Sequence, residues 1–336
     1  MRVYNSHEYL LKKAESFKPI LAYNPEADYG EWKESAINKL NELLGLPLEK
    51  CEDRFTILSK YETEEYKGVA FEFQSEQGYF IPCDLIMPLE EAKPRPTVIC
   101  LQGHSTGKHI SLGIKKYDID ENAITHSNHA IRAVKEGMCA VIFDQRYMGT
   151  AGQDKDGVPA CLRKSIGAIG AMIGRTPIGE RVWDIQRLID VLEKYLAEFV
   201  DVNRIACIGN SGGGTATFYA AALEERIYMA VPTCAVCRFE DSIMAMFHCT
   251  CNHIPNMCKY FDMGDIGCLI APRKLLIVNG VNDYMFPLDG AKACYEVIRK
   301  AYHQLGVEDA VEMKVGDAGH QFYPELAWPI IKRELF

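Results

Sequence analysis

The chain has 336 residues, of which 48% are hydrophobic and 25% are charged, a balance that predicts a globular fold with a sizeable core. Its formal net charge of -9 argues against general affinity for nucleic acids or acidic membrane surfaces, because a phosphate backbone attracts basic faces. We therefore expect neither nucleic acid nor membrane among its partners.

The N-terminal segment and the cysteines bear on the cellular compartment. Residues 1–14 lack an apolar core segment, so we expect no signal peptide, and no run of about 18 apolar residues predicts a transmembrane helix. The chain has 13 cysteines, several of them inside apolar strand-like runs, as at Cys100, Cys139 and Cys207. Such cysteines are typical of buried reduced thiols, which predicts a cytoplasmic protein.

The chain begins with a helical segment and a hairpin. Residues 1–50 are predicted to form a helical extension, because residues 31–44 place apolar side chains on one face at helical spacing. Residues 66–87 are predicted to form a β-hairpin, because apolar side chains alternate on either side of a turn at Gln77-Gly78.

Strands and helices alternate over the rest of the chain. The strands read as short apolar runs, as expected for strands covered on both faces. The alternation predicts an α/β fold with a mostly parallel central sheet and helices on both faces, in one domain over 51–336 with a cap-like insertion at 234–268. The predicted strands are 97–101, 140–144, 205–208, 229–233, 274–279 and 311–315, and the predicted helices lie near 123–136, 176–197, 212–224 and 288–305.

One turn carries more information than any other segment. The predicted strand at 205–208 enters Gly209-Asn210-Ser211-Gly212-Gly213, and a helical segment follows. These five residues fit the pattern G-x-S-x-G, whose serine stands on a strained strand-to-helix turn. The turn lacks the lysine of a phosphate-binding loop and the glycine spacing of a dinucleotide fingerprint. We interpret Ser211 as a nucleophile, and a purely structural tight turn is the alternative.

A serine nucleophile needs a general base, and the base needs an acid that orients it. In enzymes whose nucleophile stands on such a turn, the three residues follow one another along the chain as serine, acid and histidine. Here the predicted acid is Asp283, which follows the predicted strand at 274–279, and the predicted base is His320, in a glycine-bearing loop after the last strand. Asp289 is a rival acid, but it falls in the first turn of a predicted helix, where it would favour the helix dipole.

Backbone amides are predicted to stabilise a negatively charged oxygen near Ser211. One is the N–H of Gly212, directly after the nucleophile, and the other is the N–H of His104, in the small-residue loop after the strand at 97–101. Side chains in the 234–268 insertion could wall a pocket for the substrate. The predicted substrate contacts are His109, Tyr147, Met244 and Phe247.

Seven short motifs carry a family resemblance. They are Leu-Gln-Gly-His at 101–104, Phe-Asp-Gln-Arg at 143–146, Arg-Val-Trp-Asp at 181–184, Asp-Val-Asn-Arg-Ile at 201–205, Gly-Asn-Ser-Gly-Gly-Gly at 209–214, Asn-Gly-Val-Asn-Asp at 279–283 and Gly-His at 319–320. With these motifs in this order, the chain resembles the α/β-hydrolase superfamily, and within it the acetyl xylan esterase / cephalosporin C deacetylase-like esterases and dienelactone-hydrolase-like proteins.

The resemblance implies an α/β-hydrolase fold and an acyl-enzyme route that needs no metal or cofactor. It implies Ser211, Asp283 and His320 as a catalytic triad, and the amides of His104 and Gly212 as the oxyanion hole. We therefore predict a serine carboxylester hydrolase that cleaves a small ester, with acetyl groups on a carbohydrate as the substrate class; a homo-oligomer is left open. The alternatives are a peptidase or amidase of the prolyl-oligopeptidase type and a non-catalytic binding protein on a hydrolase scaffold.

Cysteines between 234 and 258 leave a zinc site open as an alternative. Cys234 and Cys237 are separated by two residues, and further cysteines and a histidine follow, as in many zinc-binding sequences. However, the first pair follows a buried strand and the later cysteines lack a matching Cys-x-x-Cys partner. We interpret these residues as thiols that line or support the cap, and we expect no bound metal. The cysteines and the histidine that follow this first pair are Cys249, Cys251, His253 and Cys258.

Overall fold

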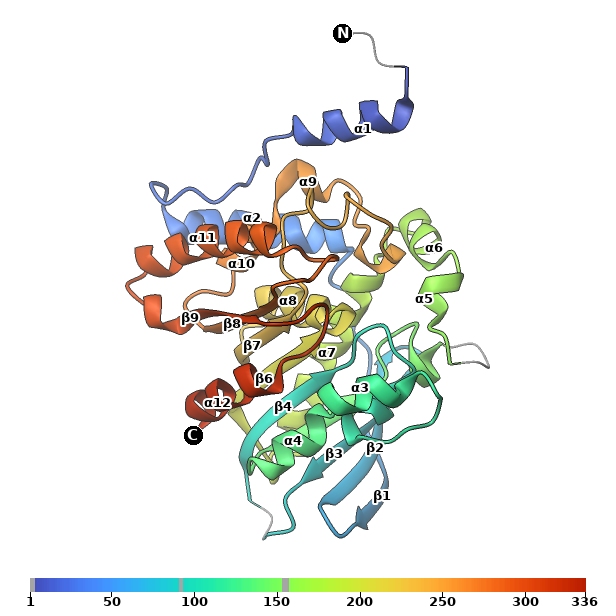
Figure 1. Ribbon diagram of the computed structural model, residues 1–336. Coiled ribbons are helices and arrows are strands. Elements are labelled where there is room, and N and C mark those ends of the chain that lie inside the picture. Colours follow the sequence, from blue (N-terminus) through green and yellow to red (C-terminus); the bar gives the residue numbers. More distant parts are fainter. Residues whose placement is uncertain (1–3, 91–92, 153–156) are drawn as a thin grey trace.

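A single sheet organises the computed structural model, which describes residues 4–90, 93–152 and 157–336 (Figure 1). Within these residues nine strands form: β1 (Thr56–Glu62), β2 (Lys67–Glu76), β3 (Tyr79–Met87), β4 (Arg95–Leu101), β5 (Cys139–Phe143), β6 (Val200–Asn210), β7 (Ile227–Thr233), β8 (Lys274–Gly280) and β9 (Val311–Gly316). Their order across the sheet is β1-β2-β3-β5-β4-β6-β7-β8-β9. β1, β2, β3 and β5 pair antiparallel, whereas every pair from β5 to β9 is parallel.

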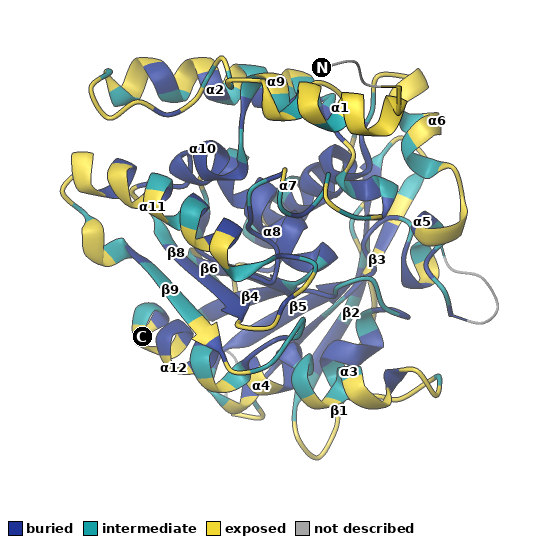
Figure 2. Cartoon of the chain, turned by 45° about the horizontal axis from the view of Figure 1, so that its top comes forward, coloured by how far each residue is buried: buried dark blue, intermediate teal, exposed yellow. Residues whose placement is uncertain are grey.

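Alternate residues of the central strands face two separate cores. In β4, Ile99 packs into one core and Val98 into the other, and in β6 Cys207 and Ala206 divide in the same way. The first core is covered by α2 (Tyr29–Leu44), α7 (Pro177–Tyr195), α8 (Gly212–Leu223), α10 (Met263–Cys268) and α11 (Leu288–Gln304), the second by α4 (His129–Lys135) and α12 (Pro324–Leu335). The prediction of a mostly parallel sheet with helices on both faces is therefore confirmed. Figure 2 shows the central strands and α8 as buried and the outer face of α11 as exposed.

Most of the predicted elements are present, with two differences. The predicted helix near 123–136 is two helices, α3 (Asp120–His126) and α4, because Ser127 leaves the helical conformation at φ -112° and ψ 22°. Serine and asparagine compete with helical hydrogen bonds through their own side chains, which explains a break at Ser127-Asn128. Strand β1 was not predicted, because its largely exposed residues show no buried apolar face.

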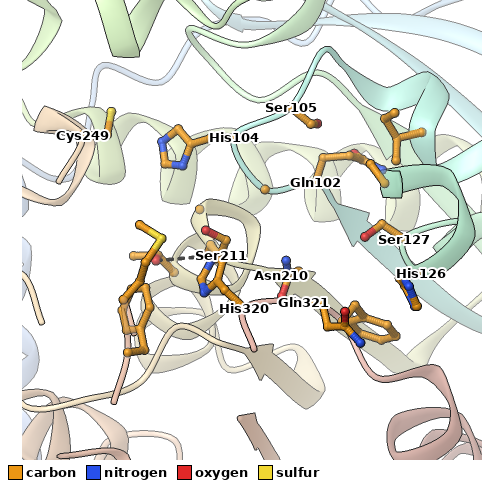
Figure 3. Close-up of a pocket in the computed structure, with 18 of the residues that line it drawn as sticks. Gln102, His104, Ser105, His126, Ser127, Asn210, Ser211, Cys249, His320 and Gln321 are labelled. Carbon is orange, nitrogen blue, oxygen red and sulfur yellow. Dashed lines mark hydrogen bonds between the residues drawn. The ribbon is translucent and has the colours of Figure 1, made fainter. Parts of the chain in front are cut away.

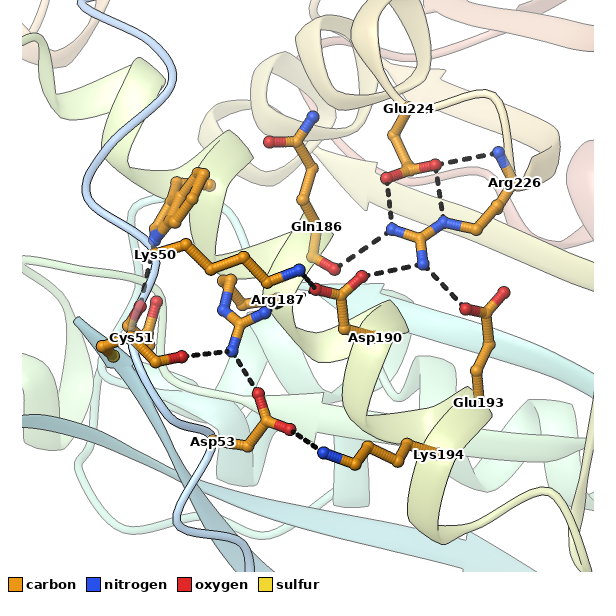
Figure 4. Close-up of polar contacts among 12 residues, drawn as sticks. Lys50, Cys51, Asp53, Gln186, Arg187, Asp190, Glu193, Lys194, Glu224 and Arg226 are labelled. Carbon is orange, nitrogen blue, oxygen red and sulfur yellow. Dashed lines mark hydrogen bonds and ion pairs between the residues drawn. The ribbon is translucent and has the colours of Figure 1, made fainter.

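The N-terminal segment contains two helices that differ in their packing. None of the residues of α1 (Ser6–Glu15) is buried, whereas α2 buries Trp32, Ala36, Leu40 and Leu44 in the first core. The connection that follows α2 is bound to α7 by ion pairs (Figure 4): Lys50 lies 3.0 Å from Asp190. Asp53 forms an ion pair with the buried Arg187 and a second one with Lys194, whose Nζ lies 3.0 Å from the carboxylate. A domain boundary at residue 50 stays a prediction.

Residues 234–268 connect β7 to the end of α10. They include the 3-10 helix η3 (Thr250–Asn252) and the short helix α9 (Met257–Tyr260). Their last part belongs to the main core, since Met263, Ile266 and Cys268 of α10 are buried there. Among the described residues, none of the helices combines the length and the hydrophobicity that spanning a bilayer requires.

Candidate active site

Ser211 stands on a strained turn between β6 and α8. Its φ of 54° and ψ of -122° lie outside the regions that residues with a side chain normally adopt. Two backbone hydrogen bonds hold the turn: Ser211 N–H donates to Thr233 O at 2.9 Å, and Thr215 N–H donates to Ser211 O at 2.8 Å. The surrounding structure thus maintains the strain, as is common at functional sites.

Glycines on either side of Ser211 allow the strand and the helix to approach closely. A Cβ added at Gly209 would lie 2.4 Å from the carbonyl carbon of Gly213, and a Cβ at Gly213 would lie 2.3 Å from Leu101 O. Neither position has room for a side chain, because each one meets backbone atoms. This close packing is the physical reason for the G-x-S-x-G spacing.

The loop after β4 lies against this turn because β4 and β6 are neighbours in the sheet. A Cβ at Gly103 would come within 2.9 Å of Asn210 O, and a Cβ at Gly212 would come within 2.7 Å of Cε1 of His104. Gly212 is the first residue of α8, so its N–H has no partner within the helix. The two predicted amide donors therefore belong to segments that touch each other beside Ser211.

A buried carboxylate and an imidazole face each other at the ends of the adjacent strands β8 and β9. The Nδ1 atom of His320 lies 2.9 Å from Oδ2 of Asp283, and Oδ1 of Asp283 accepts the N–H groups of Met285 at 2.9 Å and Phe286 at 3.1 Å. Because an ionised carboxylate only accepts, Nδ1 must carry the hydrogen of a neutral His320 ring. Its Nε2, which is buried without a hydrogen-bond partner among the described residues, is then the free proton acceptor.

The electrostatics of the pair favour this arrangement. Burial alone would raise the pKa of Asp283, but the hydrogen bond and the charge of His320, together with the Phe286 N–H, hold the pKa below its usual value. Asp283 is therefore ionised at neutral pH. The ring of Phe286 stacks on His320 with centroids 5.9 Å apart, which limits rotation of the imidazole. Beside them, burial and the charge of Asp283 raise the pKa of the Cys234 thiol, so this thiol stays neutral.

Ser211 and His320 share a cavity of about 760 Å³ (Figure 3). Polar side chains line one part of it, and Ile119, Leu162 and Phe247, all exposed, contribute an apolar rim. A cavity of this size accommodates a ligand of several rings, with the polar groups available to hydroxyls. The polar lining includes Gln102, Ser105, His126, Ser127, Asn210 and Gln321.

Of the four predicted substrate contacts, Phe247 lines this cavity and three side chains are engaged elsewhere. The buried ring of His109 bonds to Asp120 at 3.0 Å and to Thr106. The Tyr147 hydroxyl donates to Glu180, and Met244 packs against the main core. These contacts account for the three side chains and argue against direct contact with a substrate.

Cys234 and Cys237, whose spacing left a zinc site open as an alternative, have separate partners. The thiol of Cys234 donates to Gln321 O at 3.3 Å, and that of Cys237 donates to Pro287 O at 3.5 Å, so this pair is divided. Cys249 and Cys251 instead meet Cys161, a residue that sequence reasoning missed because it lies about 90 positions away. No spacing signal connects such distant residues.

Comparison with known proteins places the chain among hydrolases. A family model described as "Abhydrolase family" matches residues 3–317. A Bacillus subtilis (strain 168) protein named "Putative hydrolase YtaP" is 27% identical over 152 residues, which cover 44% of this chain and 50% of that protein. A "4-O-methyl-glucuronoyl methylesterase" of Hypocrea jecorina (strain QM6a) is 26% identical over 167 residues, or 42% of this chain and 36% of that protein. The chain thus spans half or less of these two relatives.

A solved structure extends the likeness over the whole fold. The crystal structure of a "putative acetyl xylan esterase (BF1801)" from Bacteroides fragilis NCTC 9343 superposes with a TM-score of 0.81 at 17% identity, covering 99% of this chain and 95% of that one. At this identity the likeness supports the fold alone. Together with the family match, it confirms the predicted α/β-hydrolase resemblance and fold class.

Proposed function

We propose that this chain, which belongs to the Abhydrolase family, is a serine esterase that removes short acyl groups, acetyl above all, from a carbohydrate or a similar small molecule. One observation carries the proposal: Ser211, on a strained turn, shares a cavity with an imidazole whose Nδ1 is held by a buried carboxylate. The printed names of two similar proteins, a methylesterase and an acetyl xylan esterase, support an ester of a sugar as the substrate.

In the first half of the reaction, His320 acts as the general base. Its Nε2 accepts the hydroxyl proton of Ser211 while the serine oxygen attacks the ester carbonyl carbon. Asp283 keeps the imidazole in the required tautomer and stabilises the imidazolium that forms. The resulting tetrahedral oxyanion accepts hydrogen bonds from the N–H groups of Gly212 and His104, each of which is worth about 100- to 1000-fold in rate.

In the second half of the reaction, the proton and the acyl group leave separately. The imidazolium of His320 gives its proton to the departing alcohol oxygen as the tetrahedral intermediate collapses to the acyl-enzyme. A water molecule then loses a proton to Nε2 and attacks the acyl carbon. Collapse of this second intermediate returns the proton to Ser211 and releases the carboxylic acid.

The lining of the cavity supports a polar alcohol portion of the substrate. Amide and hydroxyl side chains such as Gln102, Gln321 and Ser127 offer donors and acceptors that match sugar hydroxyls. The rim of Ile119, Leu162 and Phe247 suits the apolar face of a sugar ring. Both features lie within one cavity with Ser211, so a bound sugar would place its acyl group near the nucleophile.

The test is Ser211→Ala, assayed with p-nitrophenyl acetate and with a fluorophosphonate probe. We expect hydrolysis to fall by about 10⁴-fold or more and labelling to disappear, since the nucleophile is absent. Turnover that survives the substitution would rule out the mechanism. A folded wild-type protein that neither hydrolyses esters nor reacts with the probe would favour a non-catalytic scaffold.

The ester preference is tested with two sugar substrates whose ester bonds have opposite orientations. Acetylated xylo-oligosaccharides place the sugar on the alcohol side of the ester, and methyl glucuronate places it on the acyl side. We expect a higher kcat/KM for the acetylated substrates. The reverse order would keep the esterase mechanism and overturn the assignment of an acetyl substrate.

A further inference from the structure

Four potential metal ligands meet next to the cavity that holds Ser211 and His320, and two of them, His104 and Cys249, also line it. They are His104 in the loop after β4, Cys161 in α5 (Ala160–Arg163), Cys249 before η3, and Cys251 within η3. One ligand atom from each lies within 4.8 Å of the other three. The three cysteines are buried, and Figure 3 shows the His104 ring on the Cys249 side of Ser211.

Polar contacts connect members of this cluster, in addition to their packing against Met148. The sulfur atoms of Cys249 and Cys251 are 3.2 Å apart, and the Cys249 thiol donates to Cys161 O at 3.1 Å. The Nε2 atom of His104 is buried and has no hydrogen-bond partner among the described residues. A buried ring nitrogen that lacks a partner is costly, so its presence beside three sulfur atoms calls for a ligand.

A buried cation lies next to the cluster and favours negatively charged thiolates in it. Arg181 is 1% exposed, and its Nη2 lies 3.1 Å from the sulfur of Cys251. Its guanidinium also donates to Arg146 O, and among the described residues it forms no ion pair with a carboxylate. An unpaired buried guanidinium is costly, whereas thiolates beside it would supply the missing negative charge.

We propose that His104, Cys161, Cys249 and Cys251 bind one zinc ion in a closed tetrahedral site. Three thiolates and one imidazole are a common structural zinc ligand set, and soft sulfur ligands favour zinc over magnesium or calcium. Bonds of about 2.3 Å to zinc place tetrahedral sulfur ligands roughly 3.8 Å apart, so the present separations need only small adjustments. The ion and Arg181 together neutralise the charge of three thiolates.

The site would connect three segments that are distant in the sequence. It would fasten the loop after β4 to α5 and η3, which otherwise have few regular hydrogen bonds in common. If the proposed esterase function holds, zinc would also act through His104 as a positioning device, because the backbone N–H of the same residue is the proposed oxyanion donor. The metal site itself stands independently of that function.

The experiment measures zinc in the full-length chain, purified without chelators and analysed by plasma mass spectrometry. We expect one zinc per chain in the wild type and in Ser211→Ala, so that a failed esterase assignment leaves this result unchanged. Cys161→Ser and Cys251→Ser should each lower zinc affinity by more than about 100-fold. Losing a residue that only hydrogen-bonds to a ligand typically costs about 10- to 100-fold, and these two residues are proposed to bind the metal directly. Cys258→Ser and His253→Ala, which alter the same segment outside the cluster, should retain the metal.

A second measurement does not depend on the folding of any variant. Exchange of cobalt(II) into the wild type should give the intense visible bands of tetrahedral cobalt and the near-ultraviolet charge transfer of thiolate ligands. Three results would overturn the proposal: a wild type that takes up no zinc when zinc is supplied, full zinc retention in Cys251→Ser, or a disulfide between two of the three cysteines in metal-free protein with native activity.

Discussion

Two clusters of side chains lie close to the loop at 102–107, and they are built differently. Ser211, Asp283 and His320 each follow a parallel strand, so the sheet itself delivers them to one edge. The cluster of His104, Cys161, Cys249 and Cys251, called here the thiol cluster, joins one strand-end loop to two short helical turns. The first cluster is thus positioned by regular structure, whereas the second lies where irregular segments meet.

The largest expected effect removes the orienting acid of the first cluster. Asp283→Asn should lower kcat by about 10⁴-fold, because an amide in place of the carboxylate favours the wrong tautomer of His320. KM should change little, since Asp283 is buried behind the imidazole and does not line the cavity. Steady-state kinetics with p-nitrophenyl acetate measure both quantities.

Asp289→Asn is the matched control for this prediction. Asp289 is exposed in the first turn of α11, where a carboxylate interacts with the helix dipole. Its loss should cost at most about 1 kcal/mol of stability and leave kcat unchanged. Comparable losses of kcat in both variants would contradict the assignment of Asp283 as the acid.

The first cluster could be predicted from the sequence because its geometry follows from local rules. The pattern G-x-S-x-G reflects backbone contacts at Gly209 and Gly213 that exclude side chains, so the motif itself records the fold. Asp283 and His320 then follow from chain order, since each comes directly after a buried apolar strand. The structure brings Asp283 and His320 to a distance of 2.9 Å, as this chain order leads one to expect.

The thiol cluster and the cavity wall could not be predicted in this way. Cys161 lies in a four-residue helix, so neither spacing nor periodicity connects it to Cys251. The Cys-x-x-Cys spacing of Cys234 and Cys237 left a zinc site open as an alternative, but the two thiols donate to different segments, at Gln321 O and at Pro287 O. Tertiary packing alone decides such contacts. His126 and Ser127 reached the cavity only through the helix break.

The thiol cluster is expected to support the first cluster by holding the His104 amide in place. Cys251→Ser should lower kcat by about 10- to 100-fold with a small change in KM, because a displaced His104 amide would misplace the oxyanion donor. Wild-type protein stripped of metal should show the same loss, and restored zinc should restore kcat. Cys258→Ser provides the control and should keep the wild-type rate.

Unchanged kcat in Cys251→Ser, together with lost zinc, would separate the two clusters. The metal would then stabilise the fold without positioning the oxyanion loop. A rise in KM at constant kcat would instead place the effect on substrate binding, through the nearby cavity residues Phe247 and Asn252.

The buried ring of His129 differs from the ring of His320, because neither of its nitrogens has a hydrogen-bond partner in the described part of the chain. His129 is buried against Phe322, with ring centroids 4.3 Å apart, and both of its ring nitrogens lack a hydrogen-bond partner among the described residues. Burial lowers the pKa of His129 to about 3. Between about pH 6.5 and pH 3, His129 is therefore protonated in the unfolded chain but neutral in the folded one. The free energy of unfolding consequently falls as the pH drops below about 6.5.

His129→Phe should remove this dependence while keeping an aromatic ring in the core. From pH 7 to pH 5, the free energy of unfolding of the wild type should fall by about 2 kcal/mol more than that of the variant. Urea unfolding at the two pH values measures the difference, and titrations common to both proteins cancel. Equal losses in the two proteins would show that His129 is hydrated or hydrogen-bonded in the native state.

The smallest expected effect concerns the rim of the cavity. Phe247 is 84% exposed and lines the cavity, so its ring is free to cover a bound sugar, whereas Met244 packs against the core three positions earlier. Phe247→Ala should raise KM for an acetylated xylo-oligosaccharide by about fivefold, the equivalent of roughly 1 kcal/mol of lost apolar contact. It should leave kcat and the unfolding midpoint unchanged.

Met244→Ala should show the opposite pattern, with a lower unfolding midpoint and an unchanged KM. Its side chain is partly buried, so the loss of stability should be smaller than the about 2 to 5 kcal/mol typical of a fully buried methionine. If Met244→Ala raises KM as much as Phe247→Ala does, the segment at 244–247 moves as a unit over the substrate. If neither variant changes KM, the sugar is held by the polar side of the cavity, and the apolar rim has no part in binding.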